Sequence, residues 1–280
     1  MTDEVDRIAA ISDPFELLRE ATSRMAVAQE EVTELARLRR RVINELHQGG
    51  LSYAHIAERV GLTRGRIHQI RHGGPPAEGA FLGAGHVTIV TPLKKEAIKA
   101  RPVVAFEDVT GAQRLAELAR NLGLEPSFEH VPTTGEIDLN RPNLIVICGP
   151  RISQPVADVL SQDRRLSFER APDGPWMLVD RKAGNTYRSG QDQTPPQNSD
   201  VAYLGRLPRP DGKGSLIVFT GIHPAGSLGV VHLICTRIGE LYGEVQTDTF
   251  SVLVGTEYEP DTKEPRKVQL LTPINRHPEE

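Results

Sequence analysis

The sequence predicts an α/β protein in which an all-helical module precedes a larger mixed sheet. The first indication is the stretch from 15 to 47, where apolar residues recur every three or four positions without an internal proline or glycine, the spacing of an amphipathic helix. The second is the run NLIVIC at 143–148, whose lack of alternation is typical of a strand buried on both faces of a parallel sheet. The third is the helical pattern that follows at 153–162, because strand, loop and helix in this order indicate a βαβ unit.

Length and composition indicate a folded protein with two domains or one large one. The chain has 280 residues, 38% of them hydrophobic and 25% charged, and its net charge is −4, so bulk charge does not point to nucleic acid. Residues 37–73 nevertheless contain eight arginines against two glutamates. A local basic patch of this kind is expected where one module contacts phosphates. Cys148 and Cys235 lie in apolar runs and are expected to be buried thiols, not a disulfide or a metal pair.

No segment of the sequence predicts a membrane anchor, a metal site or a cofactor. No apolar run reaches the length of a membrane span, and the amino end lacks the pattern of a signal peptide. The nine histidines show no metal-ligand spacing. We therefore expect a cytoplasmic, nucleoid-associated protein without membrane contact, metal or cofactor.

The first domain is predicted to span residues 1–76 and to begin with a long helical region. Asp13 is placed to cap a helix that has Pro14 at its first position, and the pattern continues to about His47, either unbroken or with a break near Ala28. The apolar stripe of this region either supports the helices that follow or pairs with a second copy. We expect a homodimer, because short DNA-reading modules commonly bind two half-sites.

Residues 51–72 carry the pattern of two short helices joined by a tight turn. Ser52 can cap the first helix, Gly61 allows the positive φ that a sharp turn needs, and Thr63 can cap the second helix. The apolar side chains that would close a small core are those of Ile56, Ala57, Val60, Leu62, Ile67 and Ile70.

This stretch resembles the helix-turn-helix family, and most closely the sigma-factor region 4 type of actinobacterial transcription regulators. The resemblance covers about 25 residues and implies that the second helix lies in the major groove of double-stranded DNA. The residues that would contact DNA by this resemblance are Thr63, Arg64, Arg66, His68, Gln69 and Arg71. Arginine suits guanine edges and glutamine suits adenine edges, whereas Arg71 is expected at phosphate. The alternative is an ordinary helical hairpin with solvated arginines.

The second domain, at 101–280, is predicted to be Rossmann-like, and residues 77–100 are expected to form a linker and a first strand. The expected strands are at 86–93, 102–106, 128–131, 143–148, 201–207, 215–220, 250–254 and 267–271, with short antiparallel strands over 165–189. The expected helices run from 108 or 110 to 122, from 153 to 162, and from the turn at 221–229 to about 239 or 242.

Two loops after buried strands predict a ligand site, because open α/β sheets bind ligands at the carboxyl ends of their strands. The candidate binding residues on these loops, 148–153 and 220–229, are Gly149, Arg151, Ser153, Gly221, His223, Gly226 and Ser227. A small anionic or nucleotide-like ligand suits such helix starts. Ser227-Leu228 stands where a P-loop requires Lys and then Ser or Thr, which excludes nucleotide hydrolysis by that route. The alternative is that the glycines only pack helix against strand.

The sequence thus favours a DNA-binding transcription regulator whose α/β domain senses a small ligand. The alternatives are a protein-interaction module that uses the loop 190–199, and an enzyme recruited to DNA. We expect no enzyme, because spacing assigns no catalytic pair, and the nearest candidate is His223 with Glu257 or Glu259. Other polar and aromatic residues have structural explanations: a cap for Asp108, a loop for Asp138, a turn for Asp180 and the core for Trp176.

Overall fold

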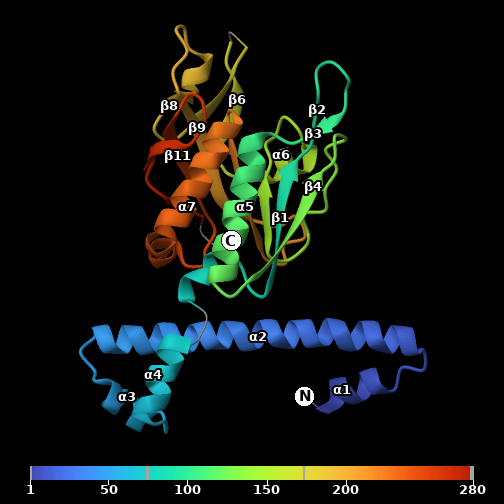
Figure 1. Ribbon diagram of the computed structural model, residues 1–280, viewed down its shortest axis with the longest axis vertical. Helices are drawn as coiled ribbons and strands as arrows, with labels where there is room; N and C mark the ends of the chain where they lie inside the picture. Colours follow the sequence, from blue (N-terminus) through green and yellow to red (C-terminus); the bar gives the residue numbers. More distant parts are fainter. Residues whose placement is uncertain (1, 74–75, 173, 278–280) are drawn as a thin grey trace. The chain divides into compact units, whose positions relative to one another are not determined.

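The computed structural model describes residues 2–73, 76–172 and 174–277, and the chain divides into two compact units. Unit 1 is Met1–Ala80 and unit 2 is Phe81–Glu280. Figure 1 shows the elements of each unit, coloured along the chain.

Unit 1 is built on one long helix. Its helices are α1 (Thr2–Ala9), α2 (Pro14–Gln48), α3 (Tyr53–Arg59) and α4 (Arg64–Gly73) (Figure 1). The side chain of Asp13 accepts a hydrogen bond from the Phe15 backbone amide at 2.9 Å, and Pro14 occupies the first helical position, as predicted. α2 continues through Ala28 without a break, because its interior contains neither a proline nor a glycine that would interrupt the backbone hydrogen bonds.

A small apolar core joins α2 to α3 and α4. Ile43 of α2 packs with Ile56, Ala57 and the fully buried Ile67. Both predicted caps form, since the hydroxyls of Ser52 and Thr63 accept hydrogen bonds from backbone amides three residues later. Gly61 has a φ of 68°, which glycine adopts without steric cost.

Val60 does not belong to this core, and its predicted place in the apolar stripe is wrong. Its side chain is 55% exposed, because Val60 is the capping residue at the end of α3. Because the backbone is no longer helical at this position, the Val60 side chain does not lie on the apolar face formed by the preceding turns of α3.

Unit 2 contains a central sheet in the order β12-β11-β9-β10-β5-β1-β4, with β13 paired to β11. The strands β4, β1, β5 and β10 are parallel, and β9, β11 and β12 continue the sheet in antiparallel pairs. This is the mixed, largely parallel α/β sheet that the sequence predicts. The bounds of these strands are β1 His86–Pro92, β4 Glu125–Val131, β5 Leu144–Ile147, β9 Ser199–Pro208, β10 Ser215–Gly221, β11 Phe250–Tyr258, β12 Pro265–Leu270 and β13 Asn275–Arg276.

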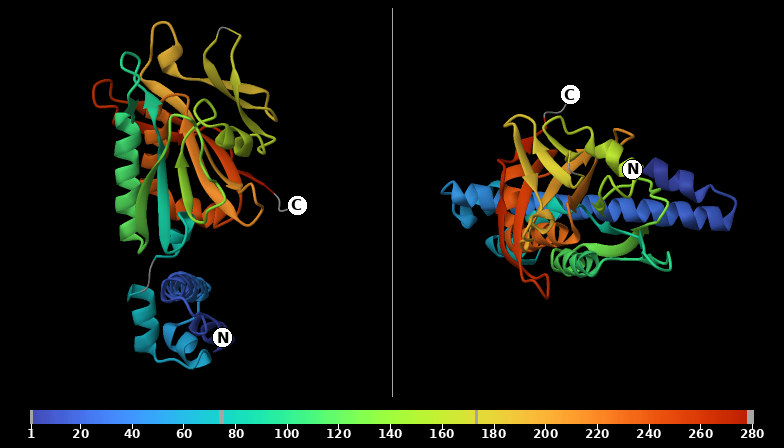
Figure 2. Two further views of the ribbon diagram at one scale, coloured as in Figure 1. Left: turned by 90° about the vertical axis from the view of Figure 1, so that its right-hand side faces the viewer. Right: turned by 90° about the horizontal axis from the view of Figure 1, so that it is seen from above.

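Two layers cover the sheet, one on each face. The helices α5 (Phe106–Asn121) and α7 (Pro224–Val245) lie on one face, and α6 (Gln154–Leu160) lies on the other with a three-stranded sheet (Figures 1 and 2). That small sheet is the predicted antiparallel region, made of β6 (Leu166–Arg170), β7 (Trp176–Asp180) and β8 (Asn185–Arg188). Trp176 packs partly buried against the core beneath it.

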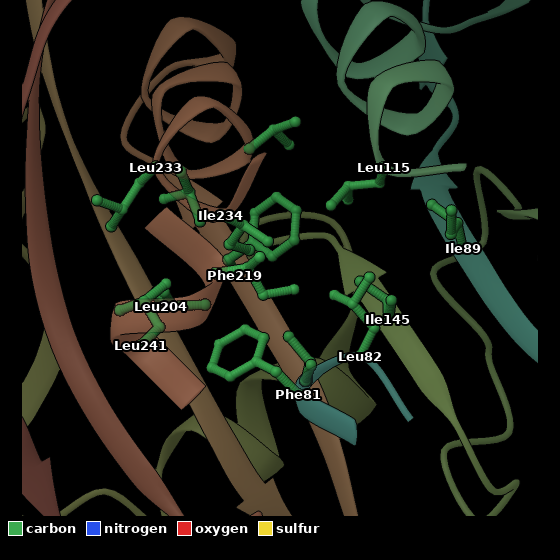
Figure 3. Close-up of a cluster of buried hydrophobic side chains, with 14 of the residues drawn as sticks. Phe81, Leu82, Ile89, Leu115, Ile145, Leu204, Phe219, Leu233, Ile234 and Leu241 are labelled. Carbon is green, nitrogen blue, oxygen red and sulfur yellow. The ribbon is translucent and has the colours of Figure 1, made fainter. Parts of the chain in front are cut away.

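Alternate residues of β5 enter the two cores, as the twofold repeat of a strand requires. Ile145 and Ile147 face α5 and α7, and Leu144 and Val146 face α6. In the first core, Leu115 of α5 and Leu233 and Ile234 of α7 lie above Phe219 in the view of Figure 3. All four β5 residues are buried, which confirms that this strand is covered on both faces.

Two segments differ from their expected structure. Within the expected linker, Ala77–Phe81 forms a 3₁₀ helix, and Phe81 and Leu82 are buried in the core of unit 2. The Phe81 carbonyl accepts a hydrogen bond from the buried Arg206. The expected strand at 102–106 is reduced to Pro102–Val103 (β3), which pairs with Lys94–Lys95 (β2) outside the central sheet. This is because Phe106 already begins α5.

Candidate functional site

The first candidate surface is the polar face of α4. Arg64, Arg66, His68 and Gln69 are all exposed, whereas Ile67 on the opposite face is fully buried. The short helix is therefore held by its apolar face and presents a cationic face to solvent. This arrangement is the one required for insertion into the major groove.

Within that face, some polar groups are already engaged. The Thr63 hydroxyl accepts a hydrogen bond from the Arg66 backbone amide at 3.1 Å, so its local role is that of a helix cap. The guanidinium of Arg66 donates to the side-chain oxygen of Gln69 at 3.2 Å. This contact fixes the two side chains side by side and leaves the Gln69 amide hydrogens available as donors.

Basic recesses flank α4. One is lined by Arg39, Arg66 and Gln69, and the other by Arg40 and Arg71 with His72. The guanidinium of Arg71, which the sequence places at phosphate, stacks over the Tyr53 ring with its carbon 5.1 Å from the ring centre. Stacking orders the guanidinium and leaves its edge N–H groups for a further acceptor.

The second candidate site is a small pocket in unit 2, with a cavity volume of about 20 Å³, roughly the room that one water molecule needs. Its lining comes from the carboxyl ends of β1, β5 and β10 and from the starts of α5 and α7. β1 leads into α5 on one face, whereas β5 leads into α6 on the other (Figure 2). Neighbouring strands whose connections diverge in this way form the topological switch point at which open α/β sheets bind ligands.

The structure brings the two predicted loops together at this pocket. Gly149, Arg151, Gly221, His223 and Ser227 all line it. Ser153 is fully buried behind it, and its hydroxyl caps α6 by accepting from the Val156 amide. Ser153 therefore serves as a helix cap and does not line the pocket, unlike the other predicted residues.

The glycines of the second loop pack against protein atoms. A Cβ at Gly221 would lie 2.1 Å from the His223 carbonyl oxygen, and one at Gly226 would lie 2.7 Å from a carboxylate oxygen of Asp200. In the first loop, a Cβ at Gly149 would lie 2.7 Å from the Thr220 hydroxyl oxygen. These glycines are required by close packing of helix against strand, which was the alternative to ligand binding.

The start of α7 is occupied by a carboxylate of the chain itself. Asp200 is buried at the beginning of β9, and its Oδ2 accepts hydrogen bonds from the backbone amides of His223 at 2.9 Å and Gly226 at 2.8 Å. The Gly221 amide donates to the Ser227 hydroxyl. Burial raises the pKa of Asp200 above its ordinary value. Asp200 therefore satisfies two of these amides and Ser227 a third, so in this arrangement they are not available to an external anion.

Asp108 contributes a second buried carboxylate, on the first turn of α5. Its side chain is 3% exposed, and its Oδ2 has no hydrogen-bond partner among the described residues. The Lys94 ammonium lies 3.6 Å from that oxygen, just beyond hydrogen-bond distance. Burial raises the pKa of Asp108 to about 6, although Lys94 opposes the rise. Its expected role as a helix cap is wrong, since Ala105 occupies the capping position of α5.

The rim of the pocket carries Arg151 and His223. Arg151 is exposed and donates a hydrogen bond to the carbonyl of Ile222. The imidazole Nε2 of His223 lies 2.9 Å from a carboxylate oxygen of Asp192, a residue of the exposed loop that the sequence predicts at 190–199. Arg151 is thus left at the rim as a cation whose remaining N–H groups can meet an incoming anion.

Sequence reasoning missed four charged residues of this region: Lys94 and Asp108, which line the pocket, and Asp192 and Asp200, which bind its second loop. For Asp108 a signal existed, because it stands four and seven positions before the buried Ala112 and Leu115 and so shares their face of the helix. Lys94 comes directly after the buried β1, at the strand end where ligands bind. Asp192 and Asp200 reach the loop at 220–229 through tertiary packing, and no local pattern indicates them.

The enzymatic pairing of His223 with Glu257 or Glu259 is not seen. Glu257 pairs with Lys267 at 3.2 Å and Glu259 pairs with Arg266, both as exposed ion pairs, and His223 is held by Asp192 instead. The thiol of Cys148 lines the pocket, but burial raises its pKa to about 12, which keeps it protonated and unreactive near neutral pH.

Two further observations concern membrane-spanning helices and the similarity of the chain to known proteins. No helix within the described ranges is both long enough and apolar enough to cross a bilayer. Comparison of the chain with protein-family models, curated proteins and solved structures found no match.

Proposed function

We propose that this protein is a sequence-specific DNA-binding regulator, located in the cytoplasm with the nucleoid, and that α4 is its reading helix. The observation that carries the proposal is the division of α4 into a buried apolar face and an exposed face with Arg64, Arg66, His68 and Gln69. In the proposed complex, Arg64 and Arg66 pair with guanine edges, and Gln69 pairs with an adenine edge. The flanking basic recesses, which hold Arg39 and Arg71, meet the phosphate backbones on either side of the groove.

The test begins with selection of duplexes from a random pool by the wild-type protein. The double variant Arg64→Ala/Arg66→Ala should then bind the selected duplex at least about tenfold more weakly, and its salt dependence should decrease by a slope of roughly 1–2. A matched control is Arg7→Ala/Arg19→Ala, which removes the same charge from two exposed arginines of unit 1. Arg19 lies about 36 Å along α2 from Ile43, where α4 packs.

The outcome distinguishes sequence-specific DNA recognition by α4 from non-specific electrostatic attraction to DNA. Loss of binding in the α4 variant alone supports the proposal. Equal loss in both double variants would indicate general charge attraction, and wild-type affinity in the α4 variant would show that α4 does not read DNA.

We further propose that the pocket in unit 2, about 20 Å³ as it stands, opens to bind a small ligand with an anionic group and hydrogen-bond donors, as a nucleotide or a hydroxylated acid has. Arg151 at the rim would bind the anionic group, and Asp108 at the buried end would accept a hydrogen bond from a ligand hydroxyl or amine once Lys94 moves aside. In this proposal the anion lies at the rim, away from the start of α7, because the backbone amides there already donate to Asp200.

Thermal denaturation of the full chain with mononucleotides, ribose and inorganic phosphate tests this ligand class. A nucleotide should raise the melting temperature more than phosphate or ribose alone does, and Arg151→Ala should reduce the rise. Stabilisation that is unchanged in Arg151→Ala would place the ligand elsewhere. Turnover of the stabilising nucleotide would favour an enzyme over a sensor.

A further inference from the structure

The surface of α2 carries an apolar seam that the core of unit 1 leaves uncovered. The large seam residues Leu18, Met25, Val32, Leu35, Val42 and Leu46 are between 37% and 73% exposed. α3 and α4 pack on a neighbouring flank of the helix, through Ile43. Exposed apolar side chains in a contiguous line along a helix mark an interaction surface.

The seam has the repeat of a coiled coil. Residues 18, 25, 32, 39 and 46 occupy one heptad position, and residues 21, 28, 35 and 42 occupy the position three residues later. Eight of these nine positions are apolar, and Arg39 is the ninth. A seam sustained over four heptads, about 42 Å of helix, is specific for pairing with another long helix.

We infer that α2 forms a two-stranded coiled coil with α2 of a second copy of this chain. The other long helices of the described residues, α5 and α7, bury their apolar faces in the core of unit 2, so they offer no matching seam. Val32 and Leu35 occupy the first and second heptad positions of the central layer, a combination that favours two strands. The single polar position, Arg39, lines the recess beside α4, so the seam is interrupted there and its apolar layers pair on either side of it.

The consequence is a protein with two α4 helices. A dimer reads two half-sites, and the geometry of its interface fixes their spacing. The inference stands apart from the proposed DNA contacts, because α2 pairs through its own apolar seam whether or not α4 binds DNA.

Sedimentation equilibrium without DNA, at about 10 μM protein, measures this directly, as association in this concentration range is well resolved. The wild-type protein should have twice its chain mass of 30.8 kDa. Val32→Lys should be monomeric, with dimer affinity reduced at least about tenfold, since a charge in the seam must be desolvated. Val27→Lys is the matched control, because Val27 is another exposed valine of α2 but lies outside the seam, and it should remain dimeric.

Met25→Lys provides a second seam variant one heptad away, and circular dichroism checks that each variant is folded. If Val32→Lys fails to fold, the comparison of Met25→Lys with Val27→Lys decides. A monomeric wild-type protein, or seam variants that dimerise as well as Val27→Lys, would overturn the inference. Because DNA is absent from this measurement, such a result leaves the role of α4 to its own test.

Discussion

Replacement of Asp108 by asparagine should change the pH dependence of stability in unit 2. The carboxyl of Asp108 is 3% exposed and its pKa is raised to about 6, against about 3.9 in the unfolded chain. A raised pKa means that the folded state binds more protons than the unfolded state between these values. The wild-type protein therefore loses stability as pH rises through that window, and ionised Asp108 costs about 3 kcal/mol above it.

Asparagine has no such titration, so the stability difference between Asp108→Asn and wild type should move in favour of the variant as pH rises. From about pH 4.5 to about pH 7.5 the expected movement is about 2 kcal/mol, because part of the effect is already present at the lower pH. Urea unfolding of both proteins at the two pH values, monitored by the fluorescence of Trp176 in unit 2, measures the change. Asp138→Asn, at an exposed turn, is the control.

A difference between Asp108→Asn and wild type that stays constant with pH would refute the reasoning. It would show that Asp108 is ionised without penalty in the folded protein. Lys94 would then compensate the buried charge more fully than its 3.6 Å separation indicates.

Three further variants or reagents probe the packing. Gly226→Ala should lower the melting temperature by several degrees, because the added methyl group meets Asp200. Gly239→Ala in the same helix has open space around its Cβ and should be neutral or stabilising. Equal melting temperatures of the two variants would contradict this reasoning. Ile67→Ala should destabilise unit 1 by about 2–5 kcal/mol by leaving a cavity, measured as loss of helical circular dichroism on heating, while the exposed Val60→Ala changes it little. Cys148 and Cys235, whose thiol pKa values burial raises to about 12 and about 11, should react slowly with a disulfide reagent at neutral pH and rapidly after unfolding; fast labelling of the native protein would show that the thiols are accessible.

Much of the fold follows from local patterns in the sequence. The caps at Asp13, Ser52 and Thr63 and the turn at Gly61 depend on a few adjacent residues, and each forms as predicted. The buried strand β5 was also predictable, because an apolar run without alternation has only one stable placement, with both faces covered. The two loops of the pocket could be found for the same reason, since each directly follows a buried strand.

The partners of those loops were decided by the tertiary structure alone. Gly221 and Gly226 have the composition of an anion-binding loop, but Asp200, more than twenty residues earlier, reaches their helix and satisfies the amides. Asp108 likewise meets Lys94 only because β1 ends and α5 begins at the same edge of the sheet. Sequence by itself determined most of the helices and strands and the edge at which a pocket forms, since these depend on neighbours along the chain. Which charged groups meet at that edge depends on residues distant in sequence, and only packing of the folded chain brings them together.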